Sequence, residues 1–200
     1  MLFSRILLTS SLAAFGLSYV IPAGQSDGLY EVFLDEHGLE VHRPLSVTSV
    51  EERSTLDVGV LGKRGRFPNT DLTPMERPKL RCGCGFHMDH GGCNDAVAEL
   101  RNQFGRSLGA SIPAGNAWYS IRSNVVAFTC APRSMTGFWP ITEESFDHFY
   151  ISTGWISQDC GSFVAGTVAE VDGGPRHGYM IHYPGLDFCG NAMGSRLDHC

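Results

Sequence analysis

Cysteine is absent from the first 81 residues of this 200-residue chain, and all seven cysteines come after them. Lysine is scarce as well, with Lys63 and Lys79 as the two in the chain. The region from residue 81 onward has no run of basic residues, and the formal net charge is −6. Binding to nucleic acid or to an anionic membrane surface depends on clustered Lys and Arg, so we expect neither kind of partner. No Asn-x-Ser/Thr acceptor occurs, which argues against N-glycosylation.

The chain also lacks an uninterrupted apolar run long enough to cross a bilayer, which takes about 20 residues. Residues 6–20 are mostly apolar but contain Thr9 and three serines, and one basic residue, Arg5, precedes them. Small residues follow near Ala23. This order is typical of a secretory signal peptide. We therefore predict a signal peptide at residues 1–23, an extracellular location and no integral membrane segment after its removal.

Residues 24–64 form a second region that is rich in acidic residues and poor in aromatic ones. Such a segment buries little apolar surface, so we predict a loosely structured pro-segment. It ends at Lys63-Arg64, a basic pair that suits a kexin-type processing protease. Residues 65–80 contain three prolines and are predicted to be a flexible lead-in. The remaining residues, 81–200, are predicted to form one cysteine-rich domain.

Two helices are predicted within this domain. The first begins near Cys93, where Asn94 and Asp95 offer capping side chains, and apolar residues at helical spacing carry it to about Gly105. The second is capped by Thr142 and has glutamates in its first turn, which the helix dipole favours.

Each predicted helix precedes a predicted β-hairpin. Residues 117–122 alternate, residues 125–130 are apolar and contain β-branched side chains, and the two segments flank the turn Ser123-Asn124. Residues 163–169 and 176–183 flank Asp172-Gly173-Gly174. An apolar sheet face must be covered, and two helices can cover it. We therefore predict an α+β domain in the order α-β-β-α-β-β, with an antiparallel sheet of about four strands, both helices on one face, and stabilising disulfides.

In an oxidising compartment the odd number of cysteines predicts three disulfides and one further cysteine, which is either a free thiol or used in a bond between molecules. The sequence leaves the connectivity open. Cys200 lies at a terminus that can fray, so it is the candidate for the free thiol. The candidates for the disulfides are Cys82, Cys84, Cys93, Cys130, Cys160 and Cys189.

A dense group of possible metal ligands offers an alternative use for some of these cysteines. It comprises Cys82, Cys84, His87, His90 and Cys93. Zinc takes four such nitrogen or sulfur ligands, but the spacing is not that of a standard zinc finger. Thiols are usually oxidised during export, so we expect disulfides here and no metal or other cofactor. A metal-binding module remains the alternative.

The sequence assigns no catalytic residue. Neither a His-Glu-x-x-His motif nor a phosphate-binding loop is present. An acid–base pair could be drawn from His148, His177 and His182 with Glu143, Glu144 or Glu170, as in a small secreted ribonuclease. Such a pair must come within hydrogen-bond reach, and nothing in the spacing brings these residues together.

Several stretches carry a resemblance to a known family. They are Cys93-Asn94-Asp95 before a helix, the Trp118-Tyr119 strand, residues 126–130, Gly161 and the final Gly178-Tyr179-Met180 strand. Over residues 82–183 the chain resembles the small secreted fungal effectors of the necrosis-inducing-factor family, and it is similar to the related killer-toxin-like α/β sandwich. The opening Cys82-Gly83-Cys84-Gly85 and the tail with its cysteines depart from that pattern, so no disulfide pairing is carried over.

The resemblance implies a secreted, non-enzymatic effector or toxin-like protein with a role in virulence. Its partner would lie on a host or competitor cell, and we expect a monomer. A small secreted ribonuclease-like hydrolase that uses His and Glu is the first alternative, and the metal-binding module at residues 82–93 is the second.

Overall fold

A computed structural model describes residues 19–45, 78–169, 173–190, 197 and 200. Its main element is a seven-stranded antiparallel sheet in the order β2-β1-β5-β6-β9-β8-β3. Two further short strands, β4 and β7, pair with each other beside it. The strands are β1 Gly28–Leu34, β2 Glu40–Pro44, β3 Lys79–His87, β4 Ser111–Pro113, β5 Ala117–Arg122, β6 Val125–Cys130, β7 Phe138–Pro140, β8 Val164–Ala169 and β9 Arg176–Ile181.

The α+β class and the antiparallel sheet with its two hairpins, β5–β6 and β8–β9, are confirmed. The expected count of four strands is wrong, because β1, β2 and β3 extend the sheet at its two edges. β3 escaped prediction because its sequence, KLRCGCGFH, is rich in glycine and cysteine and shows little alternation. The turn of the first hairpin places its positive φ, 53°, at Ser123.

Both helices begin at a side-chain cap. Helix α1, His90–Arg106, is capped by Asp89, which accepts a hydrogen bond from the Gly92 N–H at 2.7 Å, so the helix starts before the predicted Cys93. Helix α2, Glu143–Trp155, is capped by Thr142 as predicted. One turn of π-helix, η2 Ile156–Cys160, continues α2 toward β8.

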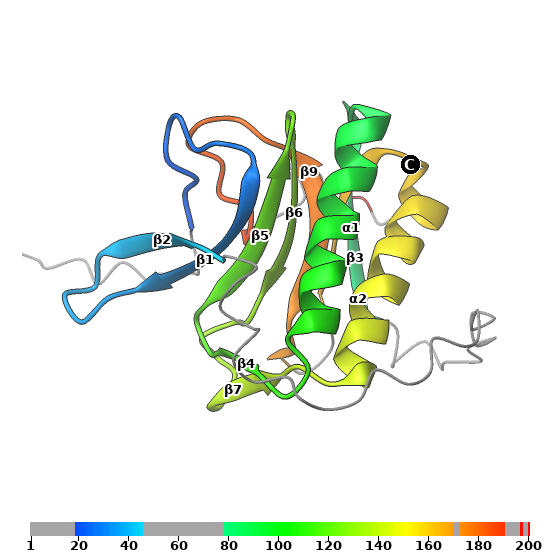
Figure 1. Ribbon diagram of the computed structural model, residues 1–200. Coiled ribbons are helices and arrows are strands. Elements are labelled where there is room, and N and C mark those ends of the chain that lie inside the picture. The colour runs from blue at the N-terminus through cyan, green and yellow to red at the C-terminus, as the bar shows by residue number, and fades with distance from the viewer. Residues whose placement is uncertain (1–18, 46–77, 170–172, 191–196, 198–199) are drawn as a thin grey trace, which may run out of the picture.

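Both helices lie on the same side of the sheet, and α1 contacts β5 and β6 while α2 contacts β8 and β9 (Figure 1). Aromatic rings fill the space between them. The ring of Phe104 on α1 lies 5.2 Å from that of Phe149 on α2 and 5.7 Å from that of Trp118 on β5, measured between centroids. Burial of such rings supplies much of the hydrophobic stabilisation.

The two ends of the described chain cover the other face of the sheet. The ring of Phe188 lies 5.0 Å from that of Tyr119 and 5.5 Å from that of Phe128. Tyr19 and Ile21, from the other end, are buried in the same core. The sheet is therefore enclosed by helices on one side and by non-helical chain on the other.

Loose structure was expected for residues 24–64, and this is wrong for β1 and β2, which belong to the main sheet. It is also wrong for Lys79 and Leu80 of the expected lead-in, which begin β3. The processing pair Lys63-Arg64 lies outside the described residues. Within the described part of the chain, no helix is both long and apolar enough to cross a membrane.

Three disulfides cross-link the fold: Cys82–Cys160, Cys84–Cys200 and Cys130–Cys189, with Cα–Cα distances of 5.4, 5.6 and 5.9 Å. The cysteine left over is Cys93, which is buried, so the assignment of the free thiol to Cys200 and of Cys93 to a disulfide is wrong. Leu197 lies beside β3, where the Cys82 N–H donates to the Leu197 carbonyl at 2.8 Å, and Cys200 is three residues further along the chain.

We expect an alkylating reagent to label a single cysteine, Cys93, when the protein is unfolded without a reducing agent. In the folded protein the same cysteine should react far more slowly, because it is buried and its thiol pKa is raised. Peptide mapping by mass spectrometry identifies the labelled residue. A label on Cys200, or labels on several cysteines, would show a different pairing.

Candidate functional site

A cavity of about 310 Å³ opens between α1 and α2 and is the candidate functional site. Cys93, Val97 and Arg101 line it from α1, where their spacing of four residues places them on one face of the helix. Tyr150, Thr153, Gly154 and Ser157 line it from α2 and η2. Tyr179 of β9 and Phe163, at the entry to β8, complete the wall. We call this cavity the interhelical pocket.

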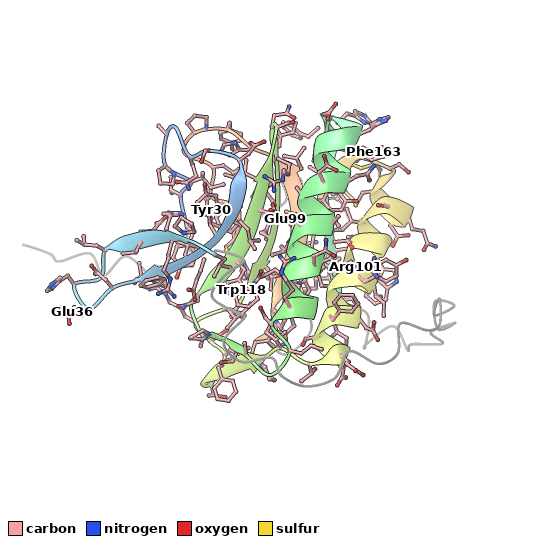
Figure 2. All side chains as sticks on the ribbon, in the orientation of Figure 1. Tyr30, Glu36, Glu99, Arg101, Trp118 and Phe163 are labelled. Carbon is pink, nitrogen blue, oxygen red and sulfur yellow. A yellow bond between two sulfur atoms is a disulfide. The ribbon has the colours of Figure 1, made fainter. Side chains whose placement is uncertain are left out.

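Arg101 gives the interhelical pocket a positive charge. Its guanidinium lies 4.3 Å from the ring centroid of Tyr150 and 5.0 Å from that of Phe146. None of the ion pairs found among the described residues includes Arg101. Figure 2 shows Arg101 between the two helices and Phe163 near one end of them. A guanidinium stacked on aromatic rings keeps its capacity to bind an anion.

Two titratable groups that line the pocket, Cys93 and Tyr179, have raised pKa values. Burial raises the pKa of the Cys93 thiol to about 11, and the charge of Asp89 acts in the same direction. Burial also raises the pKa of Tyr179 above its usual value of 10.0, although its hydrogen bond with Ser157, at 2.8 Å, acts in the opposite direction. At neutral pH both groups therefore keep their protons and can serve as hydrogen-bond donors.

Phe163 is held in an unusual backbone conformation at the edge of the pocket. Its φ is 61°, a region that bulky side chains rarely adopt. Its ring stacks on His90 with centroids 3.9 Å apart, and its carbonyl accepts from the Met88 N–H at 2.9 Å. Backbone strain of this kind costs about 1–3 kcal/mol and persists where surrounding contacts impose it.

The proposed metal ligands do not come together as a metal site. Cys82 and Cys84 are both used in disulfides, and His90 stacks on Phe163. Among the described residues, no group of three or more His, Cys, Asp or Glu is placed to hold a metal ion. Of the residues in the alternative of a metal-binding module at Cys82, Cys84, His87, His90 and Cys93, two cysteines are therefore not available as thiolate ligands in this structure.

The three histidines considered for acid–base chemistry lie in three separate environments. His148 is 3.7 Å from Glu144, but both side chains are on the exposed surface of α2. His177 is buried and lies 3.0 Å from the Thr129 hydroxyl. Burial lowers the pKa of His182. Glu170 lies outside the described residues.

A histidine–carboxylate pair that sequence reasoning missed lies in β2. His42 places one ring nitrogen, Nε2, 2.6 Å from Glu40 and the other, Nδ1, 2.6 Å from the Tyr119 hydroxyl. Tyr119 is fully buried, so no substrate can reach its hydroxyl. No signal in the sequence points to this pair, because residues 40–42 lie within the region predicted to be a loosely structured pro-segment. It joins β2 to β5 rather than lining an open cleft.

The chain also contains a Gly-x-Ser-x-Gly pattern, at residues 105–109. In hydrolases this pattern exposes a nucleophilic serine at a turn from a strand into a helix. Here Ser107 is the C-cap of α1, is buried, and accepts a hydrogen bond from the Gln103 amide at 2.8 Å. The pattern therefore ends a helix and provides no nucleophile.

Comparison of the chain with protein-family models, with curated proteins and with solved structures finds no match.

We expect the stability of the protein to fall between pH 9 and 11, and to fall less in C93S. The folded-state pKa of Cys93, about 11, exceeds the ordinary value of 9.0, so above pH 9 the unfolded chain releases a proton that the folded chain retains. The stabilisation present below pH 9 is lost as the pH rises, by roughly 2–3 kcal/mol. Urea unfolding at neutral and alkaline pH, followed by disulfide mapping, measures this difference. Equal losses in both proteins would contradict it.

Proposed function

We propose that the protein is a secreted, non-enzymatic effector or toxin-like protein that binds a partner on a host or competitor cell through the interhelical pocket. One observation carries this proposal, which is the combination of groups that line the pocket. Arg101 has no acidic partner among the described residues, and the thiol of Cys93 and the phenol of Tyr179 both have raised pKa values. Nucleophiles and general bases need pKa values near the working pH. Neutral donors beside a cation instead favour binding and orientation of a ligand.

The disulfides support an extracellular setting for this function. The three disulfides connect residues that are 59, 78 and 116 positions apart in the sequence. Such bonds form and persist in the secretory route and outside the cell. The signal peptide and the Lys63-Arg64 site remain predictions from the sequence.

The dimensions and chemistry of the pocket favour an apolar group that carries an acid. Its volume, about 310 Å³, is at the lower end of the range for small-ligand sites. Val97, Tyr150 and Phe163 provide apolar wall, and Arg101 can pair with a carboxylate. The recognised part of the partner would therefore be an aromatic or aliphatic carboxylate.

A ribonuclease-like hydrolase is the second candidate, and the 3.7 Å separation of His148 and Glu144 favours it. The side chains of this pair are 42% and 81% exposed, however, so surrounding protein gives little exclusion of water and little positioning of a substrate. This exposure places the hydrolase second.

We expect the protein to bind 1-naphthoate about fivefold more tightly than its neutral analogue 1-naphthalenemethanol, the size of effect that one partly exposed ion pair gives. R101Q should lose this preference and R106Q should keep it, because Arg106 lies in the last turn of α1 and is not among the pocket residues. Isothermal titration calorimetry measures the affinities. Equal affinity for the two probes in the unmodified protein would count against an acid-binding pocket.

Applied to target cells, the purified protein should cause a growth or cell-death phenotype that R101E abolishes. H148A and R106E should retain the phenotype, since neither residue lines the pocket. RNA degradation is measured in parallel on the same four proteins. RNA cleavage by the unmodified protein that H148A abolishes, together with loss of the phenotype in H148A, would establish the hydrolase instead.

A further inference from the structure

Residues 19–45 contribute to the hydrophobic core on the face opposite the helices. Tyr19 and Ile21 are 1% and 0% exposed, and Tyr30 and Val32 of β1 are 5% and 0% exposed. The ring of Tyr30 stacks on that of Tyr119 with centroids 5.2 Å apart. Removal of this segment would expose Tyr119 and the apolar surface around it to water.

The same segment is paired with the rest of the domain through its backbone. β1 is an interior strand, and its residues from Gly28 to Val32 pair with Ile121 to Ala117 of β5. The Ile21 N–H donates to the Leu186 carbonyl at 3.2 Å, and the Gly185 N–H donates to the Ile21 carbonyl at 3.1 Å. Without the segment, β5 would become an edge strand with unpaired backbone groups.

Side-chain contacts add to this attachment. The Tyr19 hydroxyl donates to the Gly115 carbonyl, and His42 bridges Glu40 and the Tyr119 hydroxyl. The amide of Asn116 lies 3.4 Å from the carboxylate of Glu31. These contacts join residues 19–45 to β5 and to the loop before it.

No covalent bond except the chain itself links residues 19–45 to the domain. The first cysteine is Cys82, so none of the three disulfides includes this segment. Cleavage after Lys63-Arg64 would therefore leave a fragment that is held by strand pairing and burial alone. Addition of a β-strand to a sheet edge is an established mode of peptide binding.

We propose that residues 19–45 are a permanent part of the mature protein, which after cleavage at Lys63-Arg64 consists of two chains held together non-covalently. The segment is thus the partner of a surface formed by β5, residues 115–116 and residues 185–188. The signal peptide then ends before Tyr19. Gly16 and Ser18 are small residues in the spacing that signal peptidase requires, whereas cleavage after Ala23 would remove Tyr19 and Ile21 from the core.

The proposal is tested on the full chain with a site-specific protease sequence inserted after Arg64. The purified protein is cut and passed over a size-exclusion column in native buffer, and again in denaturant without a reducing agent. We expect both fragments in one native peak and in two denatured peaks, with Tyr19 as the first residue. Separate native peaks, or a mature chain that starts at Gly24, would overturn the proposal.

Two matched variants probe the contact that retains the fragment. V32D places a charge at a position that is 0% exposed in β1, and L39D places one at a position that is 63% exposed beyond it. After cutting, V32D should release the N-terminal fragment and L39D should retain it. If V32D does not fold, the cut unmodified protein is mixed with an excess of isotope-labelled fragment 19–64. Retention of the original, unlabelled fragment supports the proposal, and rapid replacement by the labelled fragment overturns it.

Discussion

Every residue of β6 is buried, and this burial on both faces of the sheet is the constraint on which the rest of the structure depends. Helices α1 and α2 cover one face. The other face carries Tyr119 and Phe128, whose rings need cover of their own, and the segments around Ile21 and Phe188 provide it. The sheet therefore needs cover on both faces, from the helices on one and from residues 19–21 and 186–188 on the other.

The interhelical pocket follows from the way α2 is anchored. Near the middle of the helix Phe149 packs on Phe104, and beyond its C-terminal end Cys160 is joined to Cys82 on β3. Between these anchors α2 and η2 present Thr153, Gly154 and Ser157, whose small side chains leave space against α1. The packing that places Tyr179 in the wall of this pocket also buries its phenol and thereby raises the phenol pKa. The packing and the chemistry of the site therefore have one cause.

Sequence reasoning succeeded where local pattern decides the structure. The bounds of β5 and β6 follow from two segments of strand-forming residues around a two-residue turn, and α2 follows from its Thr142 cap. It failed for β1, whose sequence GLYEVFL is mostly apolar but lies in an acidic region that contains no cysteine. Arg101 carried no signal either, because only the approach of α2 places Tyr150 beneath its guanidinium.

The sequence by itself determined the α+β class, the two hairpins and the presence of disulfides, since propensity, periodicity and cysteine content belong to the residues themselves. Only the tertiary structure decided that Cys93 is the cysteine without a disulfide, that Cys84 reaches Cys200 across 116 residues, and that the first strand completes the sheet. Each of these depends on which distant surfaces meet. Which surfaces meet is determined by the need to bury both faces of one sheet, and a local sequence pattern does not contain this information.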